Sequence, residues 1–204
     1  MLFRSKLPLL LAVVSFLLYA NTLGHGFVLD DYSLILENRI TKMGTSAIPE
    51  IFQTGYRSGY FMKDDGLYRP LVKSMFATEW QWGGGSPVLF HWMNVLLYSL
   101  TGFVLYRMLF RLTKGNVFVS FVASLLFICH PIHTEVVANI KSRDEILAFL
   151  FCVWSLDSFM NWAESSSKFS LLVSSCCFFL ALLSKESAIT LLDRKSTRLN
   201  SSHT

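Results

Sequence analysis

Two adjacent carboxylates, Asp30 and Asp31, follow the first apolar block of the chain after a short hydrophobic lead. Carboxylates near the edge of a bilayer are costly to remove from water, so they need partners or a chemical role. A positioned carboxylate can act as a general base that takes the proton of an acceptor hydroxyl. The alternatives are a solvated loop pair or a cap for a helix over Tyr32–Glu37, because Asp caps helices well. Asp30 and Asp31 are therefore the candidate catalytic pair, with one acting as base and the other capping or orienting.

A second group of polar residues lies between residues 130 and 143. If Pro131 opens a helix here, Glu135, Asn139 and Arg143 recur at every fourth position and share one helical face. The planar guanidinium of Arg143 is suited to gripping two oxygens of a phosphate. The pattern predicts that Glu135 and Arg143 bind substrate close to the acidic pair.

Two histidines open the same segment. His130 and His133, together with Glu135, could be zinc ligands. The intervening proline interrupts the spacing and the sequence offers no apparent fourth ligand, so no metal is expected. We assign both histidines to anion binding or to a structural role.

Other polar residues fall within or at the ends of apolar blocks. His91, Asn94 and Tyr98 share one helical face, where they either hydrogen-bond neighbouring helices or line the site. Lys185 and Glu186 end the last block. They form either a snorkelling interfacial pair or, for Lys185, a contact with a lipid phosphate.

The elements that must position these residues are membrane helices. The chain is 52% hydrophobic and only 16% charged, whereas soluble domains carry roughly 25% charged residues. Its net charge of +4 is spread out, without a basic run that would suggest nucleic acid. Five apolar blocks of near-spanning length predict transmembrane helices. They cover residues 7–23, 88–106, 117–132, 146–163 and 169–184.

The polar stretch at residues 24–87 is expected to be a large, partly helical loop. Within it, Leu71–Trp80 places apolar residues on one helical face, which fits a globular helix or a helix lying in the membrane interface. Alternating spans put this loop and residues 130–145 on one side of the membrane. The basic turn at residues 107–116 and the N-terminus then lie on the other side, which is cytoplasmic by the positive-inside rule.

The two ends of the chain carry separate expectations. The first block, preceded by Arg4 and Lys6, is either a cleaved signal peptide or an uncleaved anchor, and the later blocks favour the anchor. Residues 193–204 lack periodicity and are interpreted as a non-native tail. The natural protein is therefore expected to continue past Leu192.

Five motifs occur in an order that resembles a known family. The motifs are Asn-Thr-Leu to Gly-Phe-Val-Leu-Asp-Asp (residues 21–31), Leu-Tyr-Arg-Pro-Leu (67–71), Phe-His-Trp-Met-Asn-Val-Leu-Leu-Tyr (90–98), His-Pro-Ile-His-Thr-Glu-Val-Val-Ala (130–138, leading to residue 143) and Leu-Leu-Ser-Lys-Glu (182–186). With these motifs the chain resembles, over residues 10–192, the transmembrane and tetratricopeptide-repeat O-mannosyltransferases and their bacterial relatives, in the GT-C glycosyltransferase superfamily.

The resemblance implies an all-α integral membrane fold, a truncated GT-C-like bundle, and an inverting transfer. The donor would be a polyprenyl-phosphate sugar, dolichyl-phosphate mannose in eukaryotes, acting as co-substrate without a further cofactor. The acceptor would be a Ser or Thr hydroxyl of a protein. The membrane would be that of the endoplasmic reticulum in a eukaryote or the inner membrane of a bacterium. Asp30 or Asp31 would match the family's acidic pair, and Arg69 matches a family position.

Two other functions remain open. Buried polar residues would also suit a transporter or another non-enzymatic membrane protein, although a transporter places its site near mid-membrane. The family's later spans and helical repeats are absent from this sequence, so the chain could also be an inactive fragment of the enzyme.

Overall fold

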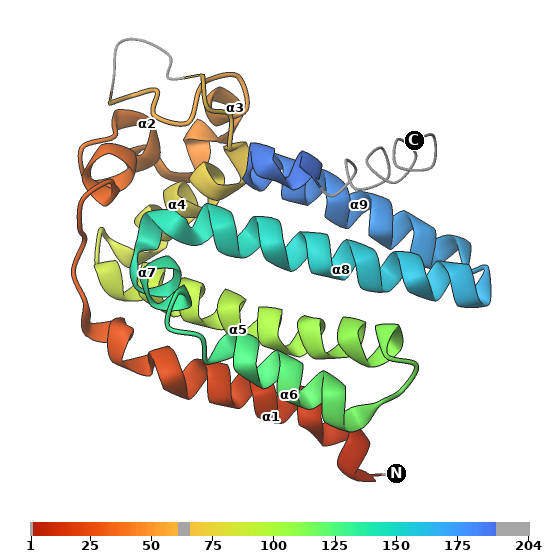
Figure 1. Cartoon of the computed structure of the whole chain (residues 1–204). Helices are drawn as coiled ribbons and strands as arrows, with labels where there is room; N and C mark the ends of the chain where they lie inside the picture. The colour runs from red at the N-terminus through yellow and green to blue at the C-terminus, as the bar shows by residue number, and fades with distance from the viewer. Residues whose placement is uncertain (1, 61–65, 191–204) are drawn as a thin grey trace, which may run out of the picture.

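The structure is a computed structural model that describes residues 2–60 and 66–190, with side chains from residue 6. Within these residues the chain forms helices and no strands, as the sequence predicts. Figure 1 shows long helices lying side by side, with short helices gathered at one end. The predicted tail at residues 193–204 lies outside the described residues.

Five long helices correspond to the five apolar blocks. Three segments are long and apolar enough to cross a membrane, namely Lys6–Gly24, Pro87–Leu112 and Ile140–Ser165. The other two helices have 12 and 17 residues, and the shorter one rises only about 18 Å at 1.5 Å per residue. The count of five spans therefore stays a prediction. The long helices are α1 (Leu2–Tyr19), α5 (Pro87–Leu112), α6 (Val117–Ile128), α8 (Arg143–Ser165) and α9 (Lys168–Ser184).

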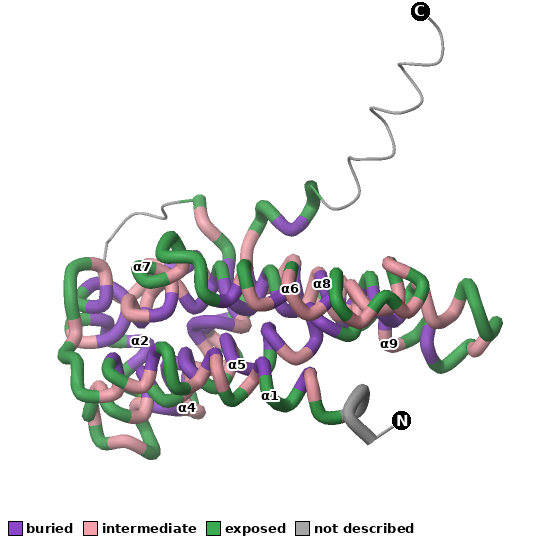
Figure 2. The backbone as a smooth tube through the Cα atoms, turned by 60° about the horizontal axis from the view of Figure 1, so that its bottom comes forward, coloured by how far each residue is buried: buried purple, intermediate pink, exposed green. Residues whose placement is uncertain are grey.

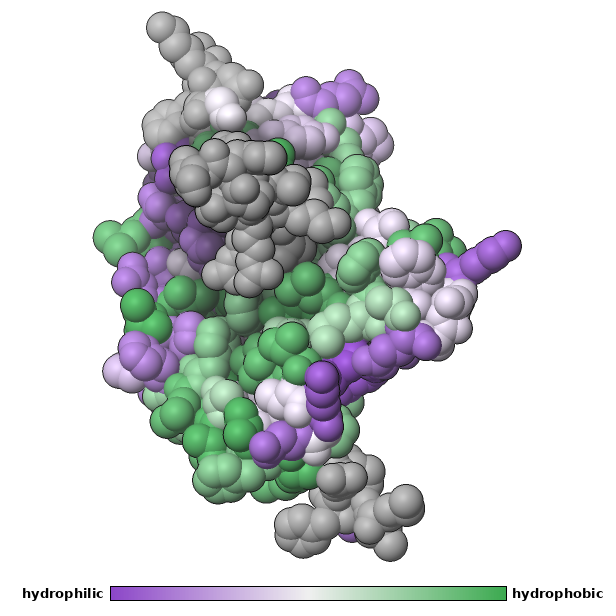
Figure 3. Space-filling view, turned by 45° about the vertical axis from the view of Figure 1, so that its right-hand side comes forward, coloured by the Kyte–Doolittle hydropathy of each residue, from purple (hydrophilic) through white to green (hydrophobic). Residues whose placement is uncertain are grey.

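Large apolar side chains are exposed along the long helices, including the two shorter ones. Leu17 is 66% exposed on α1, Leu126 is 67% exposed on α6, and Phe179 is 60% exposed on α9. Hydrophobic side chains gather across the middle of the face shown in Figure 3, with hydrophilic side chains toward its margins. Exposed apolar surface on this scale marks a membrane or protein contact, and the candidate spans favour the membrane.

Short elements occupy the connections. Within the predicted loop at residues 24–87 the described residues contain helical segments, so the loop is partly helical. The short elements are η1 (Ala20–Gly24), η2 (Tyr32–Leu36), α2 (Arg39–Lys42), η3 (Gly44–Ala47), α3 (Ile48–Ile51), α4 (Pro70–Gly83), α7 (His133–Ala138), η4 (Ile140–Ser142) and η5 (Glu186–Ile189).

Helix α4 contains the predicted apolar face and packs against several other elements. Pro70 stands in its first turn, where a missing N–H is tolerated, and Gly84 ends it in the left-handed conformation, with φ of 58°. Val72 and Phe76 are fully buried, and α4 contacts α2, η3, α5 and α9. Trp82 is 75% exposed and shares a groove with half-buried members of the predicted face. The globular and the interfacial alternatives both stay predictions, and α4 closes one end of the bundle.

Helix α1 is part of the core. A Cβ atom at Gly102 of α5 would lie 2.8 Å from Ser15 Oγ and 3.2 Å from Ile128 Cγ2, so α1, α5 and α6 meet closely there. Leu11 is fully buried in this contact. Figure 2 shows buried positions where the helices face one another. The choice between a cleaved signal peptide and an uncleaved anchor stays a prediction.

The bundle has two chemically different ends. An open groove at one end is lined by the start of α1, the turn after α5 and the end of α8; we call this the basic end. The loop at residues 24–87 and residues 130–145 meet at the opposite end, where Lys141 donates to Asp31; we call this the loop end. The grouping of segments into two membrane sides, and its assignment to cytoplasm and lumen, stay predictions.

Candidate active site

The two adjacent acidic residues belong to a tight turn formed by residues 28–31. Asp31 N–H donates to Val28 O at 2.9 Å, and Val28 N–H donates to Asp31 Oδ2, also at 2.9 Å. Leu29 lies between them in the left-handed region, with φ of 47°, a conformation that costs a non-glycine residue about 1–2 kcal/mol. The turn directs the two carboxylates into different surroundings.

Asp31 is fully buried and joins two distant segments. Its Oδ1 accepts the N–H of Lys141 at 2.9 Å, while its Oδ2 holds the turn. Burial raises the pKa of the Asp31 carboxyl, and the two backbone donors partly oppose this shift. Asp31 does not cap η2. It anchors the turn to the segment that precedes α8.

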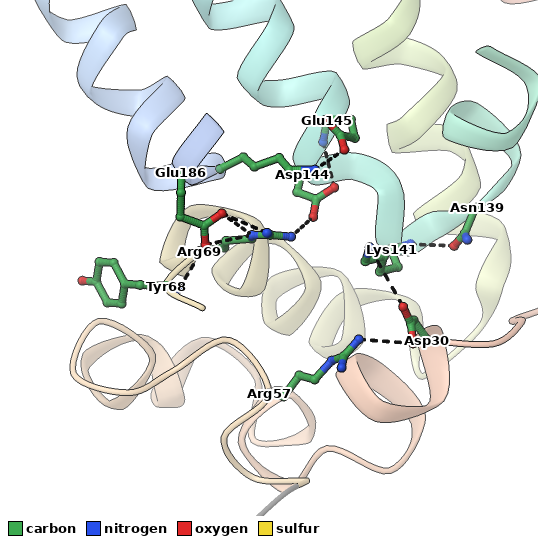
Figure 4. A network of polar contacts seen from close by, with 10 residues as sticks. Asp30, Arg57, Tyr68, Arg69, Asn139, Lys141, Asp144, Glu145 and Glu186 are labelled. Atoms are coloured by element: carbon green, nitrogen blue, oxygen red, sulfur yellow. Dashed lines mark hydrogen bonds and ion pairs between the residues drawn. The ribbon is translucent and has the colours of Figure 1, made fainter. Parts of the chain in front are cut away.

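Asp30 is the accessible member of the pair. Its side chain is 47% exposed, and its carboxylate lies 3.2 Å from Arg57 Nη2 and 4.0 Å from Lys141 Nζ. Figure 4 shows the two cations approaching Asp30 from different elements. Of the two residues, Asp30 is the one that a substrate can reach.

A groove of about 440 Å³ opens beside this pair. Glu135 lines it from α7, across from Val28 and Leu29 of the turn. Glu135 and the turn that carries the acidic pair thus line one groove, while neither Asp30 nor Asp31 lines it. The remaining lining residues are His25, Gly26, Ala138 and Asn139.

The predicted helical face that Glu135 shares with Arg143 is wrong. Helix α7 ends at Ala138, and Asn139 is extended, with φ of −96° and ψ of 118°. The Asn139 side chain then accepts the N–H of Lys141 at 3.2 Å and caps η4. A new helix starts at Arg143, so Glu135 is exposed while Arg143 is buried.

Arg143 holds three helices together. Its Nε donates to Asn94 Oδ1 at 2.7 Å and its Nη2 to Phe90 O at 2.8 Å, both on α5. Its Nη1 pairs with Glu79 of α4, and its guanidinium lies 4.7 Å from the ring centre of Phe76. All three guanidinium nitrogens are thus occupied. A contact with a substrate phosphate would require Arg143 to leave these partners.

The polar residues of α5 hydrogen-bond within the bundle, which fits the structural alternative. Asn94 donates to Asn139 O at 3.1 Å, and Tyr98 OH donates to Ile128 O at 3.2 Å. A ring nitrogen of His91 lies 3.4 Å from Gly26 O. These contacts join α5 to the segment after η1, to the segment after α7 and to the end of α6.

Arg69 joins three segments at the loop end. Its Nη1 pairs with Asp144 at the start of α8, and its Nη2 lies 2.9 Å from Glu186 Oε2 in η5. The guanidinium also lies 5.3 Å from the ring centre of Tyr56. Figure 4 shows Arg69 between the two carboxylates, apart from Asp30. In this arrangement Arg69 serves as a clamp rather than as part of the Asp30 cluster.

Sequence comparison relates the chain to a set of animal proteins. It is 34% identical over 192 residues to "Protein O-mannosyl-transferase Tmtc2" of Drosophila melanogaster, covering 88% of the chain and 20% of that protein. It is 34% identical over 197 residues to TMTC1 of Mus musculus, covering 89% and 20%. It is 32% identical over 189 residues to TMTC2 of Homo sapiens, covering 86% and 22%.

The chain belongs to the TMTC family. It spans about a fifth of the length of these curated relatives. No protein-family model and no solved structure matches it.

Lys185 of this TMTC family member pairs with Glu145 of α8, not with its neighbour Glu186. Each of the two adjacent residues thus has its ion-pair partner on another element, and the alternative contact of Lys185 with a lipid phosphate stays a prediction. Lys185 and Arg69 together fasten the end of α9 to the start of α8.

The two histidines of the HPIHTE motif have different surroundings. His130 is exposed, and its Nδ1 accepts the N–H of Ile132 at 3.2 Å. The ring of His133 packs 4.4 Å from that of Phe127, and burial lowers the pKa of His133. No group of three potential metal ligands occurs among residues 2–60 and 66–190.

Sequence reasoning missed four charged residues of this TMTC family member. Arg57 and Lys141 flank Asp30, Glu79 pairs with Arg143, and Asp144 pairs with Arg69. One signal was available for α8: Asp144 and Glu145 follow Asn139 and Ser142, which is typical of a helix start. No pattern in a single sequence pairs Glu79 with a residue 64 positions later.

Proposed function

We propose that the chain is the acidic-pair region of a membrane glycosyltransferase that moves mannose from a polyprenyl-phosphate to protein Ser or Thr hydroxyls. Its relatives are named protein O-mannosyl-transferases. The observation that carries the proposal is the accessible Asp30 carboxylate, fixed between Arg57 and Lys141 at one end of a helical bundle. A position at the bundle end also favours transfer over transport, which uses sites near mid-membrane.

Asp30 is the proposed general base. Its exposed carboxylate takes the proton of the acceptor hydroxyl as the hydroxyl oxygen bonds to the anomeric carbon of the sugar. The bond between that carbon and the phosphate oxygen breaks at the same time. Polyprenyl phosphate departs with the electron pair, and attack from the opposite side inverts the anomeric configuration.

Arg57 and Lys141 are the proposed phosphate partners. Their side chains are 27% and 26% exposed, so they can reach a ligand from their present positions. The donor phosphate is a diester with one negative charge, as on Asp30, and its two free oxygens can accept from both cations. Donor binding would then release the carboxylate for proton transfer. The phosphate gains negative charge as the sugar leaves, and both cations would stabilise it. The groove lined by Glu135 lies beside this cluster and is the proposed place for the acceptor.

Single substitutions in the full-length protein test the roles of the acidic pair. Asp30→Asn is expected to lower the transfer rate at least about 100-fold, because it removes a general base, while leaving the unfolding midpoint unchanged. Asp31→Asn keeps one acceptor oxygen where the carboxylate uses two, so it is expected to destabilise the fold by about 1–3 kcal/mol. Transfer from lipid-linked mannose to an acceptor peptide and thermal unfolding are the two measurements. A wild-type transfer rate for Asp30→Asn would show that Asp30 is not the base.

A further inference from the structure

A second charged site lies at the basic end, far from Asp30. A groove of about 430 Å³ opens between the start of α1, the end of α5 with its following turn, and the end of α8. This volume falls within the range of about 300–1,000 Å³ that is common for ligand sites. Arg107, Arg111 and Lys114 line it together with the apolar rings of Tyr106 and Phe110, and Glu164 is its acidic lining residue.

Arg111 is held in place from α8. Its Nε lies 3.1 Å from Asp157 Oδ1, and its Nη1 lies 3.3 Å from Asn161 Oδ1 and 2.5 Å from Glu164 Oε2. Glu164 is therefore engaged with Arg111. This network gives the groove a fixed wall and leaves the other two cations to face a ligand.

Arg107 and Lys114 supply the available positive charge. Arg107 is 51% exposed, and its ion pair with Asp157 is long, at 3.4 Å. Lys114 is exposed and has no ion pair within residues 2–60 and 66–190. The turn that presents Lys114 is closed, because Lys114 N–H donates to Arg111 O at 3.0 Å and Gly115 N–H donates to Phe110 O at 2.8 Å.

The groove stands where the headgroups of a bilayer would lie. The candidate span of α5 ends at Leu112, five residues after Arg107 and two residues before Lys114. Basic pockets between helices at the ends of membrane spans suit anionic headgroups, and each surface Lys or Arg adds about 1 kcal/mol to the attraction. We propose that this groove binds the phosphate of an anionic membrane phospholipid, with Arg107 and Lys114 as its ligands.

The test measures lipid binding by the full-length protein in detergent micelles. Phosphatidic acid is titrated against phosphatidylcholine, and bound lipid is read by native mass spectrometry. The double variant Arg107→Gln with Lys114→Gln is expected to lower phosphatidic acid affinity roughly 30-fold, the effect of two surface cations. Lys168→Gln is the matched control, because Lys168 is an exposed cation at the same end that does not line the groove; it should leave the affinity near that of the wild type.

Three outcomes would overturn the proposal. An equal loss in Lys168→Gln would show attraction to the whole basic end rather than to a site. Unchanged affinity in the double variant would show that Arg107 and Lys114 do not bind the lipid phosphate. Displacement of the lipid by an equal concentration of inorganic phosphate would identify a free-anion site. If the double variant unfolds, Lys114→Gln alone, whose side chain is exposed and unpaired among the described residues, must show roughly a fivefold loss.

Discussion

Replacing Arg143 by Met separates a structural role from a substrate contact. Arg143 is fully buried and pairs with Glu79, which is 4% exposed. Met fills much of the same volume but leaves the carboxylate without its cation and removes the donors to Asn94 and Phe90. Removing one partner of a buried pair costs about 3–5 kcal/mol, because the other charge stays uncompensated. We expect the free energy of unfolding to fall by at least about 3 kcal/mol.

A second variant checks the cause of that loss. Glu79→Met combined with Arg143→Met removes both charges, and buried ion pairs often tolerate replacement by apolar residues of similar size. The double variant should therefore recover much of the lost stability. Unfolding in detergent, followed by tryptophan fluorescence and circular dichroism, gives the free energies of the wild type and of the single and double variants.

Two results would refute the reasoning. A double variant as unstable as the single one would mean that the loss does not come from a stranded Glu79 carboxylate. An Arg143→Met protein with wild-type stability would mean that its buried contacts contribute little. If that stable variant also bound the donor weakly in the full-length protein, Arg143 would be a phosphate ligand, as its residue type first suggested.

Two further predictions concern stability. Burial alone would raise the pKa of Glu186, but hydrogen bonds from Arg69 outweigh this and hold it below its usual value. The stabilisation is present above the unfolded pKa of about 4.3 and is lost as pH falls through the lower native pKa. The stability gap between wild type and Glu186→Gln should therefore narrow as the pH falls below about 4.3 in unfolding measurements; a gap that stays constant would contradict the pairing. Gly102→Val would place a Cβ 2.8 Å from Ser15 Oγ, and this overpacking should lower stability by about 1–3 kcal/mol in thermal unfolding, with Gly102→Ala milder.

The helices could be predicted because they depend on local composition. Apolar blocks mark the long helices. Pro70 and Gly84 flank α4 as helix signals should. These features need only neighbouring residues and the period of a helix.

The interior of the loop end could not be predicted, because it depends on contacts between distant residues. A single extended residue, Asn139, ends α7 and turns Arg143 away from Glu135. Nothing in the sequence indicates which of Asp30 and Asp31 is accessible. In the structure the turn at Leu29 leaves the Asp30 carboxylate exposed and the Asp31 carboxylate buried.

The bond from Lys141 N–H to Asp31 also constrains how the protein is made. The two residues are 110 positions apart, and chains are synthesised at roughly 5–20 residues per second. For about 5–20 seconds after Asp31 emerges, its carboxylate has no partner beyond its own turn. During that interval the residues of α5 and α6 are made, and the chain must return to the same end of the bundle. Asp30 meets Lys141 only at that stage, so the acidic pair takes up its final surroundings late in biogenesis, after most of the described helices exist.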